Sequence, residues 1–519
     1  GAQFRDFTEG LIDVSHGTKD TKFNLTVDHC IFDSTELVSK NILQPSEIGA
    51  GFFYGDYDAN TVESNIKISN QNIKEYNRLI LKYFTFCNMQ LMICENSKMY
   101  LNYKNKLIDI YNKVNNIKKE SESKKNYNYN ENYFCNYRNK KIKFNDSTFS
   151  LMMNNKNREI REIVYKTYLN NIYINKSNLE RQLIKNKNNI IMTDNDNKLI
   201  KIIVKDLDRT KPLFNKYINI KANILKIKHI TFYDLYKSID NKKYYFNMND
   251  ICDSLNLIFN KQQLKEITKN NLLDLYPRKN KRNGYLTISH YDLEPHILIN
   301  YNNSFKDMLM VCHELGHYIV YKERQKNCTY DELNHFDDLE IPSTVNELLY
   351  MYSKLKNKNH IVIISNILDS LLNDFYRYGI YSIFENRICN DIKYKEKDNS
   401  FSDVYLKLLK FYYPSIYILE EQKYEYLKLK QLYRKNYCLK YPIAVIISYL
   451  IIYKMVTEEN YINKYKDFIY SNIDFSYENI KKNLDIDIFS VEVHNFFVEK
   501  VNELINELQF LLREEKNDN

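Results

Sequence analysis

Apolar residues recur at steps of three and four positions along most of the chain, which is the pattern of amphipathic α-helices. This periodicity predicts helices over residues 61–113, 150–190, 360–390, 402–430, 440–456 and 490–513. Within the first of these ranges the repeating residues are Tyr76, Leu79, Ile80, Tyr83, Phe84, Cys87 and Leu91. Two short segments, 285–289 and 296–299, favour strands instead. The pattern therefore predicts a mainly α fold with a small β-sheet.

Changes in composition along the chain predict three parts. Residues 1–60 hold six of the nine glycines and form an atypical N-terminal segment to which the sequence assigns no role. Residues 61–200 are expected to form a helical N-terminal domain, interrupted by a polar loop at 114–145 that is rich in Asn, Lys and Tyr. The Asn- and Asp-rich stretch at 186–198 marks the boundary to a large domain at 201–519.

One predicted buried helix, residues 307–320, contains the sequence His-Glu-Leu-Gly-His at positions 313–317. His313 and His317 are four residues apart and so lie on one face of a helix, where two imidazoles can bind the same zinc ion. Glu314 would then reach a metal-bound water. A structural role without metal is the alternative, but two histidines and a glutamate are costly in an apolar environment unless something coordinates or pairs them.

A catalytic zinc site needs a third protein ligand, and Glu340 is the best candidate. It precedes Pro342, which suits the first turn of a helix, and one face of that helix would carry Glu340, Thr344, Glu347 and Met351. Glu347 could orient a ligand histidine from behind. Taken alone, an acidic residue at a helix start is as often a cap or a solvated charge, so this alternative stays open.

The segment 340–347, Glu-Ile-Pro-Ser-Thr-Val-Asn-Glu, lies some two dozen residues after the histidine motif and resembles the third-ligand segment of the thimet oligopeptidase and oligoendopeptidase F family. Residues 231–236, 278–285, 294–300 and 436–444 are also similar to segments of that family. The resemblance covers most of residues 205–455. It implies a large helical fold of two lobes enclosing a channel, with a small sheet beside the zinc-binding helices.

The resemblance also implies roles for individual residues. His313, His317 and Glu340 match the zinc ligands and Glu314 matches the general base, while Tyr437 and Tyr441 match tyrosines that contact the substrate carbonyl or the tetrahedral intermediate. The function expected from these matches is zinc-dependent endopeptidase activity on short unstructured peptides, with one zinc ion per chain.

The sequence departs from the family pattern at three places. A histidine usual a few residues before the tyrosine helix is replaced by Gln431 or Leu432, and Val320 stands where relatives often have another histidine. Pro442 directly follows the second tyrosine and could kink its helix. The four residues expected to form the metal centre and base are intact.

The charge, the cysteines and the longest apolar run of the chain indicate which partners and which cellular compartment to expect. The net charge of +9 comes from 75 basic and 66 acidic residues dispersed along the chain, and no nucleic-acid-binding motif accompanies the clusters at Lys118–Lys119, Lys124–Lys125 and 140–143. Nine scattered cysteines without a Cys-x-x-Cys pair favour a reducing compartment, taken as the cytoplasm. The longest apolar run, 443–453, is too short to span a bilayer and predicts a buried helix.

Two alternatives to a peptidase remain. A decayed, non-catalytic family member would bind peptides or a protein partner, and the departures near the tyrosine helix favour it. A basic nucleic-acid-binding protein with a coincidental motif would show salt-dependent retention on DNA or RNA and no metal. Substrate length and preference, biological role and oligomeric state cannot be predicted from the sequence.

Overall fold

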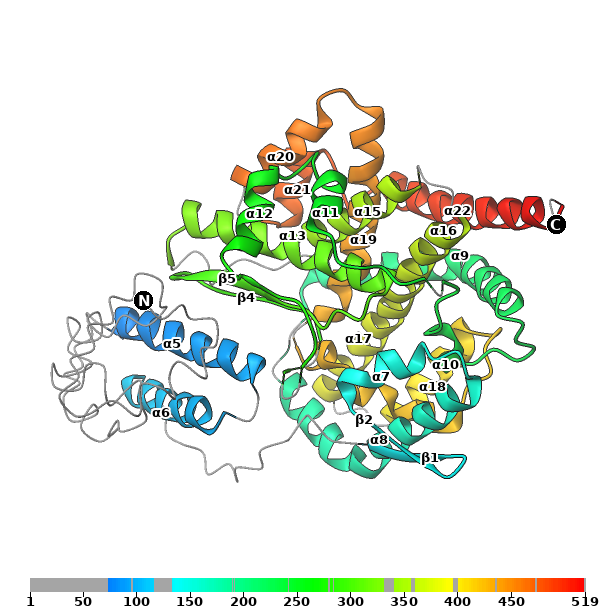
Figure 1. Cartoon of the computed structure of the whole chain (residues 1–519), viewed down its shortest axis with the longest axis horizontal. Helices are drawn as coiled ribbons and strands as arrows, with labels where there is room; N and C mark the ends of the chain where they lie inside the picture. The colour runs from blue at the N-terminus through cyan, green and yellow to red at the C-terminus, as the bar shows by residue number, and fades with distance from the viewer. Residues whose placement is uncertain are drawn as a thin grey trace. The chain divides into compact units, whose positions relative to one another are not determined.

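A computed structural model describes residues 73–517, apart from 95–96, 116–132, 189, 191, 241, 279–280, 283, 331–339, 356–359, 395–399, 435 and 472–473. The fold is mainly α with small sheets, as the sequence predicts (Figure 1). The chain divides into two compact units, residues 1–126 with 277–283 and 288–296, and residues 127–276 with 284–287 and 297–519. The predicted three-part division, including the separate segment 1–60, stays a prediction.

The described helices of the first unit are α5 (Ile73–Ile93) and α6 (Lys98–Val114), which pack against each other. Leu79, Ile80, Tyr83 and Cys87 are buried at the predicted helical spacing. Residues 61–72 of the predicted helical range lie outside the described residues. The unit also contains the turn between two later strands, where Arg78 forms an ion pair with Asp292.

The second unit begins with a hairpin and two long helices. Its first elements are β1 (Tyr133–Tyr137), β2 (Lys140–Phe144), α7 (Asp146–Met153), α8 (Arg158–Lys187) and α9 (Asp194–Ile224). The prediction of a loop over 114–145 was wrong for residues 133–144, which form the antiparallel hairpin. Tyr133 and Phe144 face each other across the strands and are buried, and this pair outweighs the polar composition that suggested a loop.

Short elements connect α9 to the sheet: α10 (Phe232–Leu235), α11 (Met248–Ser254), α12 (Lys261–Lys269), β3 (Leu273–Asp274), β4 (Leu286–His290) and β5 (Leu293–Leu298). The strands are ordered β3-β5-β4, and β3 pairs with β5 in parallel. Strands β4 and β5 include most of the two segments predicted from alternation, and β4 lies at one edge.

The rest of the second unit is helical. It contains α13 (Phe305–Asn327), α15 (Ile341–Lys354), α16 (His360–Ser370), η2 (Leu371–Arg377), α17 (Tyr378–Tyr394), α18 (Phe401–Tyr412), η3 (Glu420–Lys428), η4 (Lys430–Tyr433), α19 (Tyr437–Thr457), α20 (Tyr461–Ser471), α21 (Tyr477–Leu484) and α22 (Val491–Asn517). The prediction of one helical stretch over 402–430 needs correction, because α18 ends before Tyr413 and 3₁₀ turns follow. Pro414, which cannot donate a backbone hydrogen bond, directly follows that end.

The apolar run at 443–453 forms the buried middle of α19, as predicted. Among the described residues, α19 is the one helix whose length and composition would allow it to cross a membrane, and 67% of its most apolar stretch is buried inside the protein. Buried core helices of soluble proteins share this length and composition, so this is weak evidence for a membrane span. Helix α19 packs against α15 and α17 and so supports the elements that carry the candidate site.

Candidate metal centre

Helix α13 presents His313 and His317 on one side, one turn apart. Ser304 caps its N-terminus in a capping box with Asp307, and this pairing fixes where the helix begins. Leu309, Val311, Cys312 and Leu315 are buried on other faces of the helix. Cys312 therefore has a packing role, and burial raises the pKa of its thiol well above the usual value.

Helix α15 brings Glu340 to the two histidines. Glu340 occupies the N-cap position and Pro342 lies in the first turn, in agreement with the sequence prediction. The two helices approach closely at Gly316, where an added Cβ would lie 2.5 Å from the Cα of Ser343. The Asn346 side chain also donates to the Cys312 carbonyl at 3.1 Å. The glycine inside the histidine motif is thus required by backbone contact.

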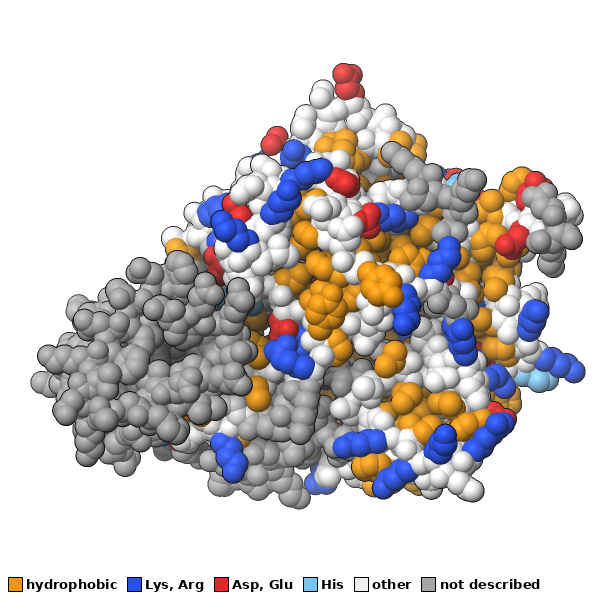
Figure 2. Space-filling view, viewed as in Figure 1, with side chains coloured by type: hydrophobic (Ala, Val, Ile, Leu, Met, Phe, Trp, Pro, Cys, Tyr) orange, Lys and Arg blue, Asp and Glu red, His pale blue; other side chains and the backbone are white. Residues whose placement is uncertain are grey.

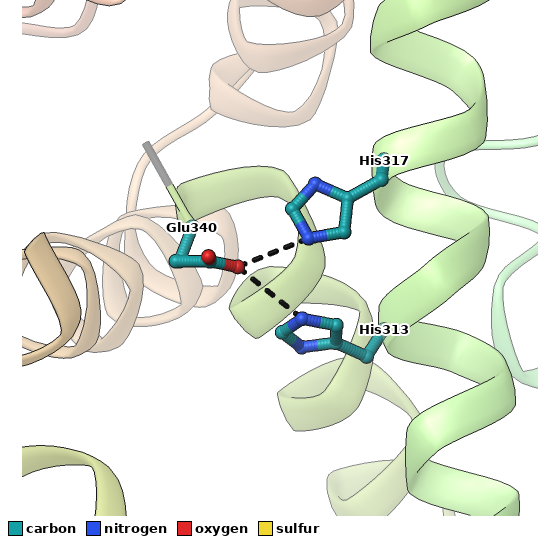
Figure 3. Close-up of side chains that lie close together, drawn as sticks. All are labelled: His313, His317 and Glu340. Carbon is teal, nitrogen blue, oxygen red and sulfur yellow. Dashed lines mark ion pairs between the residues drawn. The ribbon is translucent and has the colours of Figure 1, made fainter. Parts of the chain in front are cut away.

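The imidazoles of His313 and His317 and the carboxylate of Glu340 converge (Figure 3). The Nε2 atoms lie 3.2 and 3.0 Å from the same carboxylate oxygen, Oε2 of Glu340. The potential ligand atoms of the three residues are within 4.8 Å of one another. Glu340 Oε2 is buried and accepts no well-aligned hydrogen bond from the described residues. Two imidazoles and a carboxylate are a donor set that suits zinc, so these residues fit the metal.

Charges within this group shift the protonation of its members. Burial lowers the pKa of His313, but Glu340 and Glu347 outweigh this effect and hold it well above the usual value. The pKa of His317 is raised too, because Glu340 offsets the effect of burial. Burial raises the pKa of Glu340, yet the two imidazoles keep it well below its usual range. In each of the three residues the charges of its partners outweigh burial and favour the ionised form.

Glu347 lies behind His313, where the sequence placed it. The Nδ1 of His313 is 2.6 Å from Oε1 of Glu347, a contact that aims Nε2 of the same ring at Glu340. Glu347 also lines a small cavity together with Asp374. Burial, with a contribution from the nearby Glu347 charge, raises the pKa of Asp374 to about 7.

Glu314 is buried beside the histidines and contacts strand β4. The Thr287 hydroxyl lies 2.6 Å from Oε2 of Glu314 and 3.0 Å from its backbone carbonyl oxygen. A hydrogen bond to Oε2 restricts the carboxylate and leaves Oε1 as the other proton-accepting atom. Sequence reasoning missed Thr287, because no spacing rule connects a strand residue to a helix 27 positions later.

The two tyrosines occupy the first turns of α19. The Tyr437 hydroxyl donates to Oε1 of Glu340 at 3.0 Å, so this phenol contacts the candidate ligand itself. The Tyr441 ring stacks on Tyr378 with 4.1 Å between ring centroids. Burial, together with the charge of Glu340, raises the pKa of Tyr441 well above the usual value, so its phenol is a neutral donor at pH 7.

The departures noted in the sequence have structural counterparts. Gln431 lies near the side chain of Tyr441 and lowers the pKa of this phenol, against the larger effect of burial. Helix α19 continues from residue 437 to residue 457 with Pro442 inside it. Proline lacks the N–H that would otherwise pair with the Cys438 carbonyl, and its ring also crowds that carbonyl, yet the helix extends past this position.

Comparison with known sequences places the part of the chain that carries the candidate site in one protein family. Peptidase family M3 matches residues 151–470, which include every candidate site residue. An oligoendopeptidase F homolog of Borreliella burgdorferi is 26% identical over 61% of this chain and 60% of its own length. The oligopeptidase PepF of Bacillus subtilis is 24% identical over 71% of this chain and 60% of its own length. The matched part thus spans about 60% of these relatives.

Solved structures show the same fold at lower identity. Oligoendopeptidase-F from Enterococcus faecium superposes with a TM-score of 0.61 at 14% identity, covering 92% of this chain and 98% of that one. The structure of PZ peptidase A with an inhibitor gives a TM-score of 0.68 at 13% identity, covering 92% and 98%. The fold is therefore the helical fold of the oligoendopeptidases, as the resemblance implied. With 320 of its 519 residues inside the family match (151 to 470 inclusive), the chain belongs to peptidase family M3.

Proposed function

We propose that this protein is a zinc-dependent endopeptidase that hydrolyses short, unstructured peptides. The observation that carries the proposal is the convergence of His313 Nε2 and His317 Nε2 on one buried oxygen of Glu340. Glu314 is next to the first of these histidines on the same helix, and Glu347 holds the far side of that imidazole. Membership of a peptidase family agrees with this reading of the residues.

His313, His317 and Glu340 would hold one zinc ion per chain. A zinc ion bound there supplies Lewis-acid polarisation of a water molecule and of the scissile carbonyl. In the proposed reaction Glu314 accepts a proton from water as the water oxygen bonds to the carbonyl carbon. Glu314 then gives that proton to the peptide nitrogen as the C–N bond breaks. The Thr287 hydroxyl holds the carboxylate of Glu314 through a hydrogen bond to Oε2. Tyr441 is the neutral phenol proposed to donate a hydrogen bond to the carbonyl oxygen of the substrate as that oxygen becomes negatively charged.

Peptides in extended conformation are the proposed substrates. Strand β4 lies at the sheet edge and brings Thr287 against Glu314, so main-chain pairing with such an edge would deliver a peptide near the base. Pairing through the main chain tolerates many side chains, which fits a broad substrate range. The nine cysteines of the sequence are scattered and form no Cys-x-x-Cys pair, and for this reason we propose a reducing, cytoplasmic location.

Glu314→Gln tests the assignment of the base. The amide keeps the size of the side chain but cannot accept a proton, so turnover is expected to fall below detection while zinc content stays at one per chain. His317→Ala is the companion variant, and it should lose both zinc and turnover. Full activity in Glu314→Gln would overturn the proposed mechanism.

A non-catalytic peptide-binding member of the family is the second candidate. The observation in its favour is that the Tyr437 hydroxyl donates to Glu340 at 3.0 Å and so is directed to a proposed ligand. One zinc per chain with no hydrolysis of any peptide in a diverse panel would favour this candidate.

A nucleic-acid-binding protein is less well supported. Lys and Arg side chains are spread across the described face in Figure 2, with hydrophobic side chains between them, and do not form one stripe. On the hairpin, Lys141 lies over the Phe134 ring at 4.3 Å, an arrangement that needs no nucleic acid to explain it.

A further inference from the structure

A buried ion pair lies where three helices meet, and neither of its members is a candidate metal ligand. Lys187 is the last residue of α8, and its ammonium group pairs with the Glu385 carboxylate of α17. The exposed fraction is 1% for each residue. The proposed reaction uses neither of them. A buried ion pair contributes little net stability by itself, so the other contacts of the pair decide what it does.

Both members of the pair also hold the backbone that leads into α19. The Lys187 ammonium donates to the Arg434 carbonyl at 2.6 Å. Glu385 Oε2 accepts the backbone N–H of Cys438 at 3.3 Å. Residue 438 belongs to the first turn of α19, where backbone N–H groups have no partner inside the helix. A carboxylate in this position caps the helix and interacts favourably with its dipole.

The residue at the N-cap position of α19 does not cap the helix with its side chain. Asn436 occupies the N-cap position in the left-handed conformation, with φ of 47°, and its side chain makes no capping hydrogen bond to the helix. Its amide instead donates to Oδ2 of Asp196, in the first turn of α9, at 2.7 Å. The end of α8 and the start of α9 therefore hold the chain at Arg434 and Asn436, and Glu385 holds it at Cys438.

Tyr437 lies between these anchor points. Its backbone is fixed by the contacts on either side, and its hydroxyl donates to Oε1 of Glu340, a proposed zinc ligand. We infer that Lys187 and Glu385 are positioning residues for the metal centre, which set the first turn of α19 so that the Tyr437 hydroxyl meets Glu340. The expected effect on catalysis rests on the proposed function. The effect on the position of the first turn of α19 does not depend on it.

A second buried lysine provides a matched control. Lys221 on α9 is fully buried, pairs with the Asp369 carboxylate at 2.6 Å and donates to the Leu235 carbonyl at 2.9 Å. It thus has the same three features as Lys187, namely burial, a carboxylate and a backbone carbonyl. The contacts that the structure describes for Lys221 are to Asp369 and Leu235 and not to α19, so Lys221→Met should cost stability without disturbing Tyr437.

The first test measures backbone hydrogen exchange in the full-length protein for peptides covering residues 436–445. Lys187→Met should speed exchange in this segment at least ~10-fold, because the capping carboxylate loses its counter-charge and the Arg434 carbonyl loses its donor. Lys221→Met should leave the segment unchanged. Equal exchange in the two variants would overturn the inference, whether or not the protein is an enzyme.

The second test measures peptide hydrolysis with zinc-loaded protein. Lys187→Met should lower kcat ~10- to 100-fold, as expected for a small displacement of a positioned group, while KM changes by less than about threefold. In a Tyr437→Phe background the same substitution should lower kcat no further, because the hydroxyl that it positions is already gone. An equal, additive loss in both backgrounds would assign Lys187 a purely structural role.

The double variant Lys187→Met/Glu385→Gln keeps the inference testable if the single variant Lys187→Met fails to fold. It removes both charges and retains a side-chain oxygen that can accept the Cys438 N–H. It should recover much of the lost thermal stability and of the exchange protection at 436–445. Recovery of stability with no recovery of protection would contradict the inference. An inactive wild-type protein would count against the proposed function alone, since the exchange test still decides the positioning role.

Discussion

The residues closest to the proposed chemistry could mostly be predicted from sequence, since a fixed spacing on one helix relates them. His313, Glu314 and His317 needed only helical geometry, and Glu340 with Glu347 needed the assumption that Pro342 begins a helix. The structure brings His313 and His317 together with Glu340. It also places Glu347 in contact with His313. Their roles in binding zinc and moving a proton remain proposals.

Thr287 shows what spacing rules cannot find at this scale. It belongs to β4, and its contact with Glu314 depends on how the sheet edge lies against α13. The two tyrosines show a different limit. Periodicity did not distinguish them among 47 tyrosines, and the family resemblance singled them out.

Thr287→Val tests whether the hydroxyl restrains the proposed base. Valine keeps the branched shape but removes the one hydrogen bond that Glu314 Oε2 accepts from the described residues. We therefore expect kcat to fall about 10-fold while zinc content and KM stay close to wild type. Thr287→Ser restores the hydroxyl and should recover most of the activity. Steady-state kinetics on one peptide check both variants, and equal activity in the valine and serine variants would remove Thr287 from the account.

At the scale of elements, the metal centre depends on how closely α13 and α15 approach. Gly316 allows that approach, since its hydrogen atom faces the backbone at Ser343. The sequence showed a glycine within the histidine motif but not what opposed it. Element types were predicted well where apolar spacing was long and regular, as in α8 and α19. They were predicted poorly at 133–144 and 413–430, where a cross-strand aromatic pair and a proline decided the outcome.

Gly316→Ala should push α15 away from α13 and displace Glu340 from the histidines. We expect a loss of about 1–3 kcal/mol in the free energy of unfolding and weaker zinc binding, measured by chemical denaturation and competition with a chelator. Gly379→Ala in α17 is the matched control, because its Cβ would meet only the movable side chain of Leu207, at 3.0 Å. Unchanged zinc affinity in Gly316→Ala would show that the helix contact does not position Glu340.

At the scale of the whole molecule, the fold class followed from periodicity, whereas the supporting contacts did not. Lys187 and Asp196 lie about 240 to 250 residues before the α19 turn that they hold. No local pattern announces a contact across that separation, and a lysine at a helix end is ordinarily interpreted as solvated. The compact units also combine segments far apart in the chain, which composition alone does not reveal.

The central claim is that three residues of this chain hold a zinc ion for peptide hydrolysis. The most direct test measures zinc stoichiometry on the purified protein together with cleavage of a quenched-fluorescent peptide of about ten residues, with and without a chelator. The account predicts one zinc per chain and cleavage that the chelator abolishes and added zinc restores. Protein that binds no zinc, or cleavage that continues after complete removal of the metal, would contradict it.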